Sequence, residues 1–131
     1  MNIILVVDEN PKNLVLITSQ LLILNYEVVT ATIAGKALDI ARLLKPSLII
    51  MDSYVNDDAD WTEIRQLRQI DELRDVPLIV ISGNGIPQVR ARAIEAGCTE
   101  FIRKPYDIRL LGEIVNRYFT RDISATNLRQ P

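Results

Sequence analysis

Leu48-Ile49-Ile50-Met51-Asp52 is the stretch of sequence that decides the fold, because four consecutive apolar residues lead directly into a carboxylate. A continuous apolar run of this length is typical of a strand buried on both faces, as in parallel sheets that lie under helices. Asp52 then stands at the end of a buried strand, where open α/β sheets bind their ligands. The alternative is that Asp52 only caps the next helix. The residues that follow the other strands decide between these two interpretations.

Apolar runs of this kind alternate with helical patterns along the chain. The expected strands are the runs at residues 3–7, 26–31, 48–52, 78–81 and 99–103. Apolar residues at helical spacing follow each run, and the whole pattern repeats about every 20–30 residues, the size of a βα unit. This alternation predicts an α/β fold, with a single doubly wound five-stranded parallel sheet and helices on both of its faces.

Capping residues indicate where the helices begin and end. Asn10 can cap the first helix, and Pro11 suits its first position because the missing N–H costs nothing there. Asn25 and Gly97 can end helices in a left-handed conformation, and Asp107 can cap the last helix.

The length of 131 residues fits one domain with a hydrophobic core. No helical period continues past residue 119. We therefore expect a domain at residues 1–119 and a flexible C-terminal tail at residues 120–131.

Composition excludes several classes of function. The formal net charge is −2 without a long basic run, which argues against direct binding to nucleic acid. The single cysteine, Cys98, excludes an intrachain disulfide and fits a reducing compartment. No apolar stretch approaches the ~20 residues of a membrane span, and no basic leader precedes the first strand, so we expect a cytoplasmic protein without membrane contact. The absence of histidine excludes His-ligated metals and Ser-His or Cys-His catalysis.

Polar side chains follow four of the five expected strands. Asp8 and Glu9 follow the first strand, Asp52 ends the third, Ser82 follows the fourth and Lys104 follows the fifth. Because all strands of a parallel sheet end at the same edge, these five side chains are expected to converge.

Three converging carboxylates repel one another unless a cation lies among them. Mg²⁺ is a natural counter-ion because it takes oxygen ligands, usually one or two carboxylates with waters and phosphate oxygens. Such a site suits phosphoryl transfer, which depends mostly on positioning and on neutralising charge. Asp52 can act as the nucleophile, while Lys104 and the Ser82 hydroxyl balance the phosphoryl oxygens.

With these residues in place, the sequence resembles a response regulator receiver domain of two-component signal transduction, similar to the chemotaxis regulators, over residues 2 to 119. The acid pair of that family matches Asp8-Glu9 within Ile-Leu-Val-Val-Asp-Glu-Asn-Pro, and its phosphoacceptor matches Asp52. Its hydroxyl position matches Ser82, and its Lys-Pro pair matches Lys104-Pro105. The resemblance implies a flavodoxin-like strand order 2-1-3-4-5, for which a receiver is itself a standard example. It also implies a candidate cis bond between Lys104 and Pro105.

The resemblance further implies how the protein acts. Asp52 would accept a phosphoryl group from a phosphohistidine of a sensor histidine kinase or histidine phosphotransfer protein, as in a phosphorelay, with Mg²⁺ (or Mn²⁺) required. The metal ligands would be Asp8, Glu9, Asp52 and the backbone carbonyl of Tyr54. The chain would be a signalling domain that catalyses its own phosphotransfer and slow dephosphorylation, and not an enzyme acting on other substrates.

The resemblance implies a switch as well. The Ser82 hydroxyl would move toward the phosphoryl group and Phe101 would turn inward. This change would remodel the face formed by the fourth helix, fifth strand and fifth helix. The same face is a possible contact surface for a homodimer.

The loop after Asp52 departs from the family pattern. Asn56 and Asp60 stand where the family usually has proline and glycine, so the loop geometry is expected to differ. Tyr54 is bulky enough to overhang the site.

Two other functions are compatible with this fold class. A pseudo-receiver would bind partners without phosphorylation, but such proteins usually lack the acceptor, the acid pair or the lysine, and none is lost here. A phosphatase with an aspartate nucleophile needs a second aspartate beside it and a substrate cap, whereas position 54 is tyrosine. Trp61 and Cys98 are interpreted as core residues and not as a ligand platform or redox sensor.

Overall fold

The computed structural model describes residues 2–32, 34–52, 61–83 and 85–129, except for the side chains of residue 34 and of residues 120–129. Its strands are β1 (Ile3–Asp8), β2 (Glu27–Ala31), β3 (Leu48–Asp52), β4 (Leu78–Ser82) and β5 (Glu100–Arg103). Its helices are α1 (Pro11–Ile23), α2 (Ala34–Leu44), α3 (Thr62–Arg68), α4 (Pro87–Ala96) and α5 (Ile108–Arg129), with a short 3₁₀ helix η1 (Asp71–Leu73). The loop that carries Tyr54, Asn56 and Asp60 lies outside the described residues.

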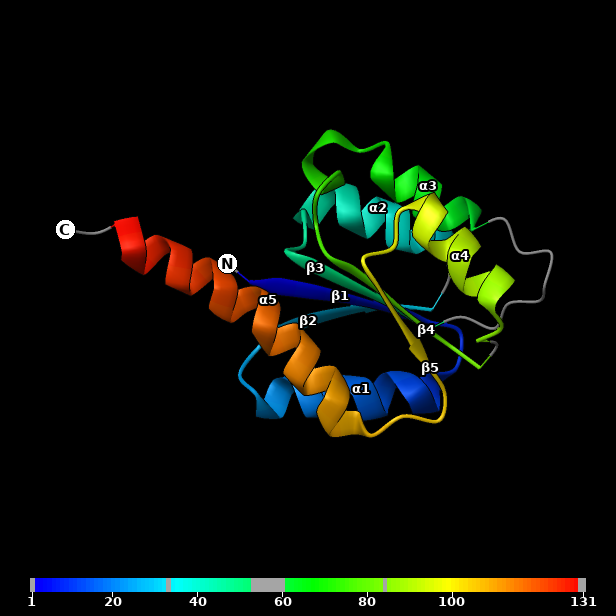
Figure 1. The fold of residues 1–131 in the computed structure, drawn as a ribbon, viewed down its shortest axis with the longest axis horizontal. Helices are drawn as coiled ribbons and strands as arrows, with labels where there is room; N and C mark the ends of the chain where they lie inside the picture. The colour runs from blue at the N-terminus through cyan, green and yellow to red at the C-terminus, as the bar shows by residue number, and fades with distance from the viewer. Residues whose placement is uncertain (1, 33, 53–60, 84, 130–131) are drawn as a thin grey trace.

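The five strands form one parallel sheet in the order β2-β1-β3-β4-β5, which confirms the predicted fold (Figure 1). β3 lies at the centre, and all five of its residues are buried. β2 lies at one edge, as its more polar composition suggests, and is more exposed. The central position of β3 places Asp52 between the ends of β1 and β4.

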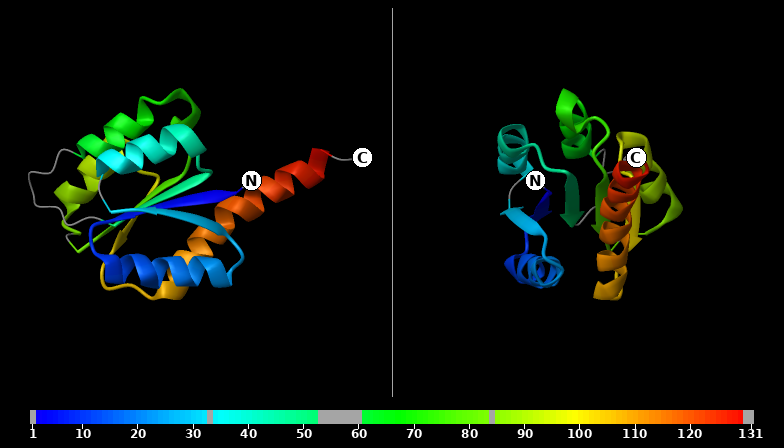
Figure 2. Two further views of the ribbon diagram at one scale, coloured as in Figure 1. Left: turned by 180° about the vertical axis from the view of Figure 1, so that it is seen from behind. Right: turned by 90° about the vertical axis from the view of Figure 1, so that its left-hand side faces the viewer.

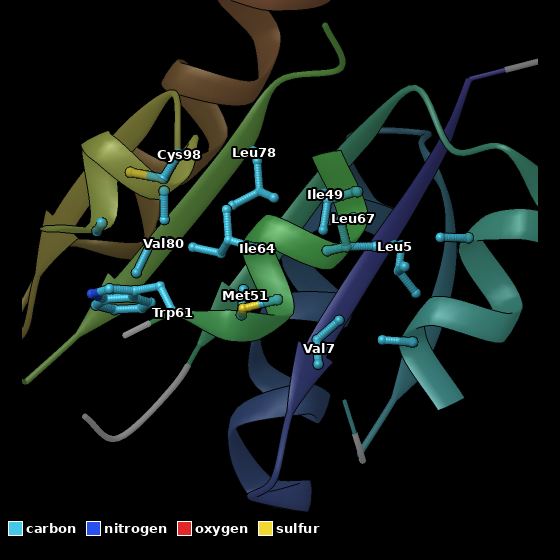
Figure 3. Packing of buried hydrophobic residues seen from close by; sticks show 14 of the residues in the cluster. Leu5, Val7, Ile49, Met51, Trp61, Ile64, Leu67, Leu78, Val80 and Cys98 are labelled. Atoms are coloured by element: carbon cyan, nitrogen blue, oxygen red, sulfur yellow. The ribbon is translucent and has the colours of Figure 1, made fainter. Parts of the chain in front are cut away.

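Helices cover both faces of the sheet (Figures 1 and 2). α1 and α5 lie on one face, while α2, α3 and α4 lie on the other. Side chains along each strand alternate between these faces. Leu5 and Ile49 pack under α2 and α3, as Figure 3 shows, while Ile4 and Ile50 pack against α1 and α5. Trp61 is 3% exposed in the first of these clusters, which confirms its interpretation as a core residue.

The predicted caps are present. The Asn10 side chain accepts a hydrogen bond from the Lys12 amide at 2.9 Å, and Pro11 occupies the first turn of α1. The Asp107 carboxylate accepts one from the Arg109 amide at 2.9 Å. Asn25 has a φ of 69° just after α1, a left-handed conformation that asparagine tolerates.

Two details were not evident from the sequence pattern. The segment after α3 is rich in charged residues, yet Leu73 within η1 is fully buried. The last helix was expected to end near residue 119, whereas α5 continues to Arg129. Its end projects beyond the sheet (Figure 1), where a helix needs no apolar face, and no glycine or proline interrupts residues 113–130. Residues 120–129 are therefore helical, and the flexibility of residues 120–131 stays a prediction.

Within the described ranges, the molecule has no helix with both the length and the hydrophobicity that a membrane span requires.

Candidate functional site

Asp8 and Asp52 lie side by side at the C-terminal edge of the sheet. β1 and β3 are parallel neighbours, and their register pairs Asp8 with Asp52 directly. In-register residues of parallel strands project to the same side, so both carboxylates enter the same space. Both side chains are nevertheless buried, at 4% and 5% exposure. Two buried carboxylates in contact are costly unless a cation compensates them.

Lys104 supplies one such cation. Its Nζ lies 2.8 Å from Oδ1 of Asp52, although the sequence separates the two residues widely. The Lys104 amide donates a hydrogen bond to the Ser82 carbonyl at 2.8 Å, which ties the residue to the end of β4. The Lys104–Pro105 peptide bond is cis, as predicted.

The charge of Asp52 is set by opposing influences. Burial raises the pKa of Asp52 above its ordinary value, the hydrogen bond from Lys104 lowers it, and the Asp8 carboxylate raises it further. The net direction is upward. One ammonium group therefore does not fully offset burial and the second carboxylate.

The residues present fit a bound Mg²⁺. Asp8 uses Oδ1 to accept a hydrogen bond from the Asn10 amide at 2.9 Å, whereas its buried Oδ2 has no hydrogen-bond partner among the described residues. A buried anionic oxygen beside a second carboxylate is the kind of ligand that Mg²⁺ takes.

Glu9, the third predicted carboxylate, is exposed next to Asp8. No group of three or more acidic or thiol side chains is placed to hold a metal in the part of the chain that the structure describes. The pair of Asp8 and Asp52 is thus the acidic centre of the site, and the roles of Glu9 and of the Tyr54 carbonyl as metal ligands stay predictions.

Ser82 and Phe101, the predicted switch residues, lie on neighbouring strands. Ser82 is fully buried at the end of β4, one residue beyond Ile81, which pairs with Asp52. Phe101 on β5 is half-buried, and its ring meets Trp61 edge to face with 6.5 Å between centroids. Their roles in a switch stay predictions.

The structure adds a groove and one further residue, Tyr106, to the predicted site. A groove of about 480 Å³ runs between α1 and the β5–α5 connection, and Asp52 and Lys104 lie in its lining. Tyr106 lines the same groove from the connection. Its position two residues after Lys104 is a sequence signal that could have identified it.

The environment of Tyr106 shows that it belongs to the site. Burial and the nearby carboxylates of Asp52 and Asp8 raise the pKa of Tyr106 to about 12. The phenol therefore remains neutral, and it can offer a hydrogen-bond donor next to the acidic pair.

Comparison with known proteins identifies a family and a fold. The sequence profile described as the response regulator receiver domain matches residues 4–116. The polar-differentiation response regulator DivK of Brucella anthropi is 27% identical over 115 residues, which cover 88% of this chain and 94% of that protein.

Solved structures agree with this match. The receiver domain of a sensor histidine kinase from Pseudomonas aeruginosa, described with a magnesium ion coordinated in its active site cleft, is 27% identical with a TM-score of 0.78, covering 88% of this chain and 95% of that one. The chemotaxis response regulator CheY4 of Vibrio cholerae shares the fold, with a TM-score of 0.80 at 21% identity and coverage of 89% and 98%.

Proposed function

The chain belongs to the response regulator receiver family, and on this basis we propose that Asp52 accepts a phosphoryl group from a phosphohistidine. The observation that supports this proposal most directly is the buried Asp52 carboxylate with the Lys104 ammonium at 2.8 Å and Asp8 in register beside it. A structural salt bridge alone would not require the second buried carboxylate, since it raises the cost of burial.

The residues of the site have distinct roles in the proposed transfer. An Asp52 carboxylate oxygen attacks phosphorus, the bond between phosphorus and the histidine nitrogen breaks, and its electron pair leaves with the imidazole. Lys104 acts as a point charge beside the transferred group, and the hydroxyl of Ser82, at the end of the adjacent strand, donates a hydrogen bond to a phosphoryl oxygen. Bound Mg²⁺ (or Mn²⁺), held by Asp8 and Asp52 with Glu9 and the Tyr54 carbonyl as further proposed ligands, supplies charge neutralisation for the phosphoryl oxygens.

The proposed output is a change of surface. A phosphoryl group on Asp52 adds negative charge next to Ser82, and movement of Ser82 would let Phe101 turn toward the space that it leaves. Phe101 lies on β5, between α4 and α5. We propose this α4–β5–α5 surface as the contact for a downstream partner or a second copy of the chain.

The phosphodonors that we propose are a sensor histidine kinase or a histidine phosphotransfer protein. The exchange would take place in the cytoplasm, in line with a single thiol, Cys98, that is buried and unpaired.

The test is phosphorylation of the purified chain with Mg²⁺ and acetyl phosphate, followed by intact mass. We expect the parent protein to gain the mass of one phosphoryl group and Asp52→Asn to gain none. Asp39→Asn, which changes an exposed aspartate on α2, is the matched control and should be modified like the parent.

A parent protein that never gains mass, with Mg²⁺ present and the fold intact, would reject phosphoacceptor function. The pseudo-receiver alternative would then be favoured. Modification of Asp52→Asn to the same extent as the parent would show that another residue is the acceptor.

A further inference from the structure

Trp61, just before α3, combines two features that are unusual for a core residue. Its side chain is 3% exposed, yet the indole Nε1 has no hydrogen-bond partner among the described residues. Its backbone has a φ of 57°, a left-handed conformation that is uncommon for a bulky side chain. A buried donor without a partner and a left-handed backbone both cost free energy. Because such costs concentrate at functional positions, the surroundings of Trp61 indicate what its placement achieves.

A row of side chains beneath the indole leads from Trp61 to Phe101. The strand register pairs Met51 of β3 with Val80 of β4, and Val80 with Phe101 of β5. These three side chains project to the face of the sheet on which Trp61 also lies. Figure 3 shows the indole next to Val80, with its nitrogen on the side away from Met51. Trp61 therefore lies on the inner side of Phe101, toward the centre of the sheet.

The rings of Trp61 and Phe101 are in contact. They meet edge to face, with 6.5 Å between centroids and 81° between the ring planes. Aromatic pairs in this arrangement are favourable beyond the area that they bury. Phe101 is only half-buried in this position. The contact with the indole therefore stabilises the partly exposed orientation of Phe101.

An inward turn of Phe101 needs the space that the indole occupies. Protein cores are close-packed and contain few voids, so two aromatic rings cannot share the position next to Val80. The indole must then move when Phe101 turns inward. Movement that brings Nε1 to water or to a carbonyl gives the donor a partner, which offsets part of the lost ring contact.

We propose that Trp61 is a positioning residue of the switch: its indole blocks the inward turn of Phe101 in the unphosphorylated protein and moves aside when Asp52 is phosphorylated. This inference rests on the proposed function and adds the residue that sets the balance between the two orientations of Phe101. The Trp61 carbonyl also accepts hydrogen bonds from the amides of Ile64 and Arg65, at 3.1 and 3.2 Å. Movement of Trp61 thus connects the switch to the start of α3.

The test uses incorporation of 4-fluorophenylalanine and ¹⁹F NMR, because the sequence contains two phenylalanines. One is Phe101, and the other, Phe119, is buried on the opposite face of the sheet and serves as an internal reference. We expect the Phe101 signal to shift when the parent is phosphorylated with Mg²⁺ and acetyl phosphate.

Trp61→Leu should move the Phe101 signal toward its phosphorylated position without any phosphodonor. The expected rise in the ratio of inward to outward orientations is about threefold to tenfold, the equivalent of one aromatic contact. Trp61→Phe keeps a ring beside Phe101 and removes the unpaired donor, so its ratio should equal that of the parent or lie below it.

Leu67→Ala is the matched control for lost packing. Leu67 is buried in the same cluster and also lies on α3, but Figure 3 shows it beside Ile49, at the other end of the helix. This variant should lower the stability of the protein, as truncations of core residues do, and leave the Phe101 signal where it is in the parent.

Fluorescence gives a second readout, since Trp61 is the single tryptophan of the sequence. Phosphorylation should shift its emission to longer wavelength as the indole leaves its buried position. Phe101→Leu should remove most of this shift, because the turning ring displaces the indole. This measurement uses the parent fold, so the test does not depend on the stability of Trp61→Leu.

Three outcomes would overturn the role of Trp61 while leaving Asp52 as the acceptor, provided that intact mass shows phosphorylation of the parent. The first is an unchanged Phe101 signal in folded Trp61→Leu, and the second is an equal shift in Leu67→Ala. The third is an emission shift that is absent in the parent or undiminished in Phe101→Leu. A parent protein that gains no mass from acetyl phosphate overturns the proposed function and this inference with it.

Discussion

The Asp52 side chain is almost fully buried between an acidic neighbour, Asp8, and a basic neighbour, Lys104. Burial raises its pKa, and the folded state consequently holds the Asp52 proton more tightly than the unfolded chain does. Between the ordinary value of 3.8 and the folded pKa, the unfolded chain binds fewer protons than the folded one. The free energy of unfolding therefore falls as pH rises through this window, because ionised Asp52 is penalised only when folded.

Asp52→Asn removes this penalty. We expect the variant to be more stable than the parent at pH 7 without Mg²⁺, on the order of 1 kcal/mol, and the difference to shrink as the pH falls below about 4. Urea unfolding at both pH values measures this. Asp39→Asn, at an exposed site, should show no such pH-dependent gain, and an Asp52→Asn variant less stable than the parent at pH 7 would contradict the explanation.

At the scale of elements, the guanidinium of Arg68 joins three segments at the edge of the sheet opposite the site. It donates hydrogen bonds to the carbonyls of Leu73 at 2.7 Å, Val76 at 2.6 Å and Gly97 at 2.7 and 2.9 Å. The end of α3 is thereby tied to the segment leading into β4 and to the turn after α4. The planar fork of arginine makes these simultaneous contacts possible.

Arg68→Met should lower the free energy of unfolding by about 2–3 kcal/mol, because several charge-assisted hydrogen bonds to carbonyls are lost. Arg68→Lys should recover less than half of this loss, since an ammonium cannot form the same fork. Chemical denaturation measures both changes. The control is Arg42→Met, an exposed arginine at the end of α2, and equal stabilities for Arg68→Met and Arg42→Met would refute the role of Arg68.

At the scale of the whole molecule, a metal ion held by the acidic pair would couple metal binding to folding. Asp8 and Asp52 belong to different strands, so their shared site exists only when β1 and β3 are paired. A ligand that binds only the folded state raises the free energy of unfolding with its concentration.

We expect Mg²⁺ at about 100 times its dissociation constant to stabilise the parent protein by about 2.7 kcal/mol, and EDTA to reverse the effect. Asp8→Asn should abolish most of this response, whereas Glu95→Gln, an exposed change on α4, should retain it. Unfolding midpoints measured with Mg²⁺ and with EDTA provide the comparison. A parent protein whose midpoint is the same under both conditions would show that the pair does not bind Mg²⁺.

Local sequence patterns predicted most of the helices and strands, because the signals for these elements lie within a few neighbouring residues. The apolar run at residues 48–52 predicted the central strand, and Asn10 and Asp107 predicted helix starts, since caps and burial depend on neighbouring residues. Patterns were less informative where burial is not periodic. Leu73 is a single core residue within a polar segment, and residues 120–129 continue α5 without an amphipathic face.

The sequence by itself determined the strand order, through the family resemblance. It also determined which residues stand at the ends of the strands, and these residues share one edge of the sheet because the strands are parallel. Only the tertiary structure decided which of these residues meet: Lys104 reaches Asp52, Asp8 lies beside it, and exposed Glu9 stays outside the buried pair. The groove and the place of Tyr106 in it also required the structure. The physical reason is that both features form between segments that are distant in sequence: the groove lies between α1 and the β5–α5 connection, and the buried acidic pair lies at the ends of β1 and β3. No local pattern encodes how such segments meet.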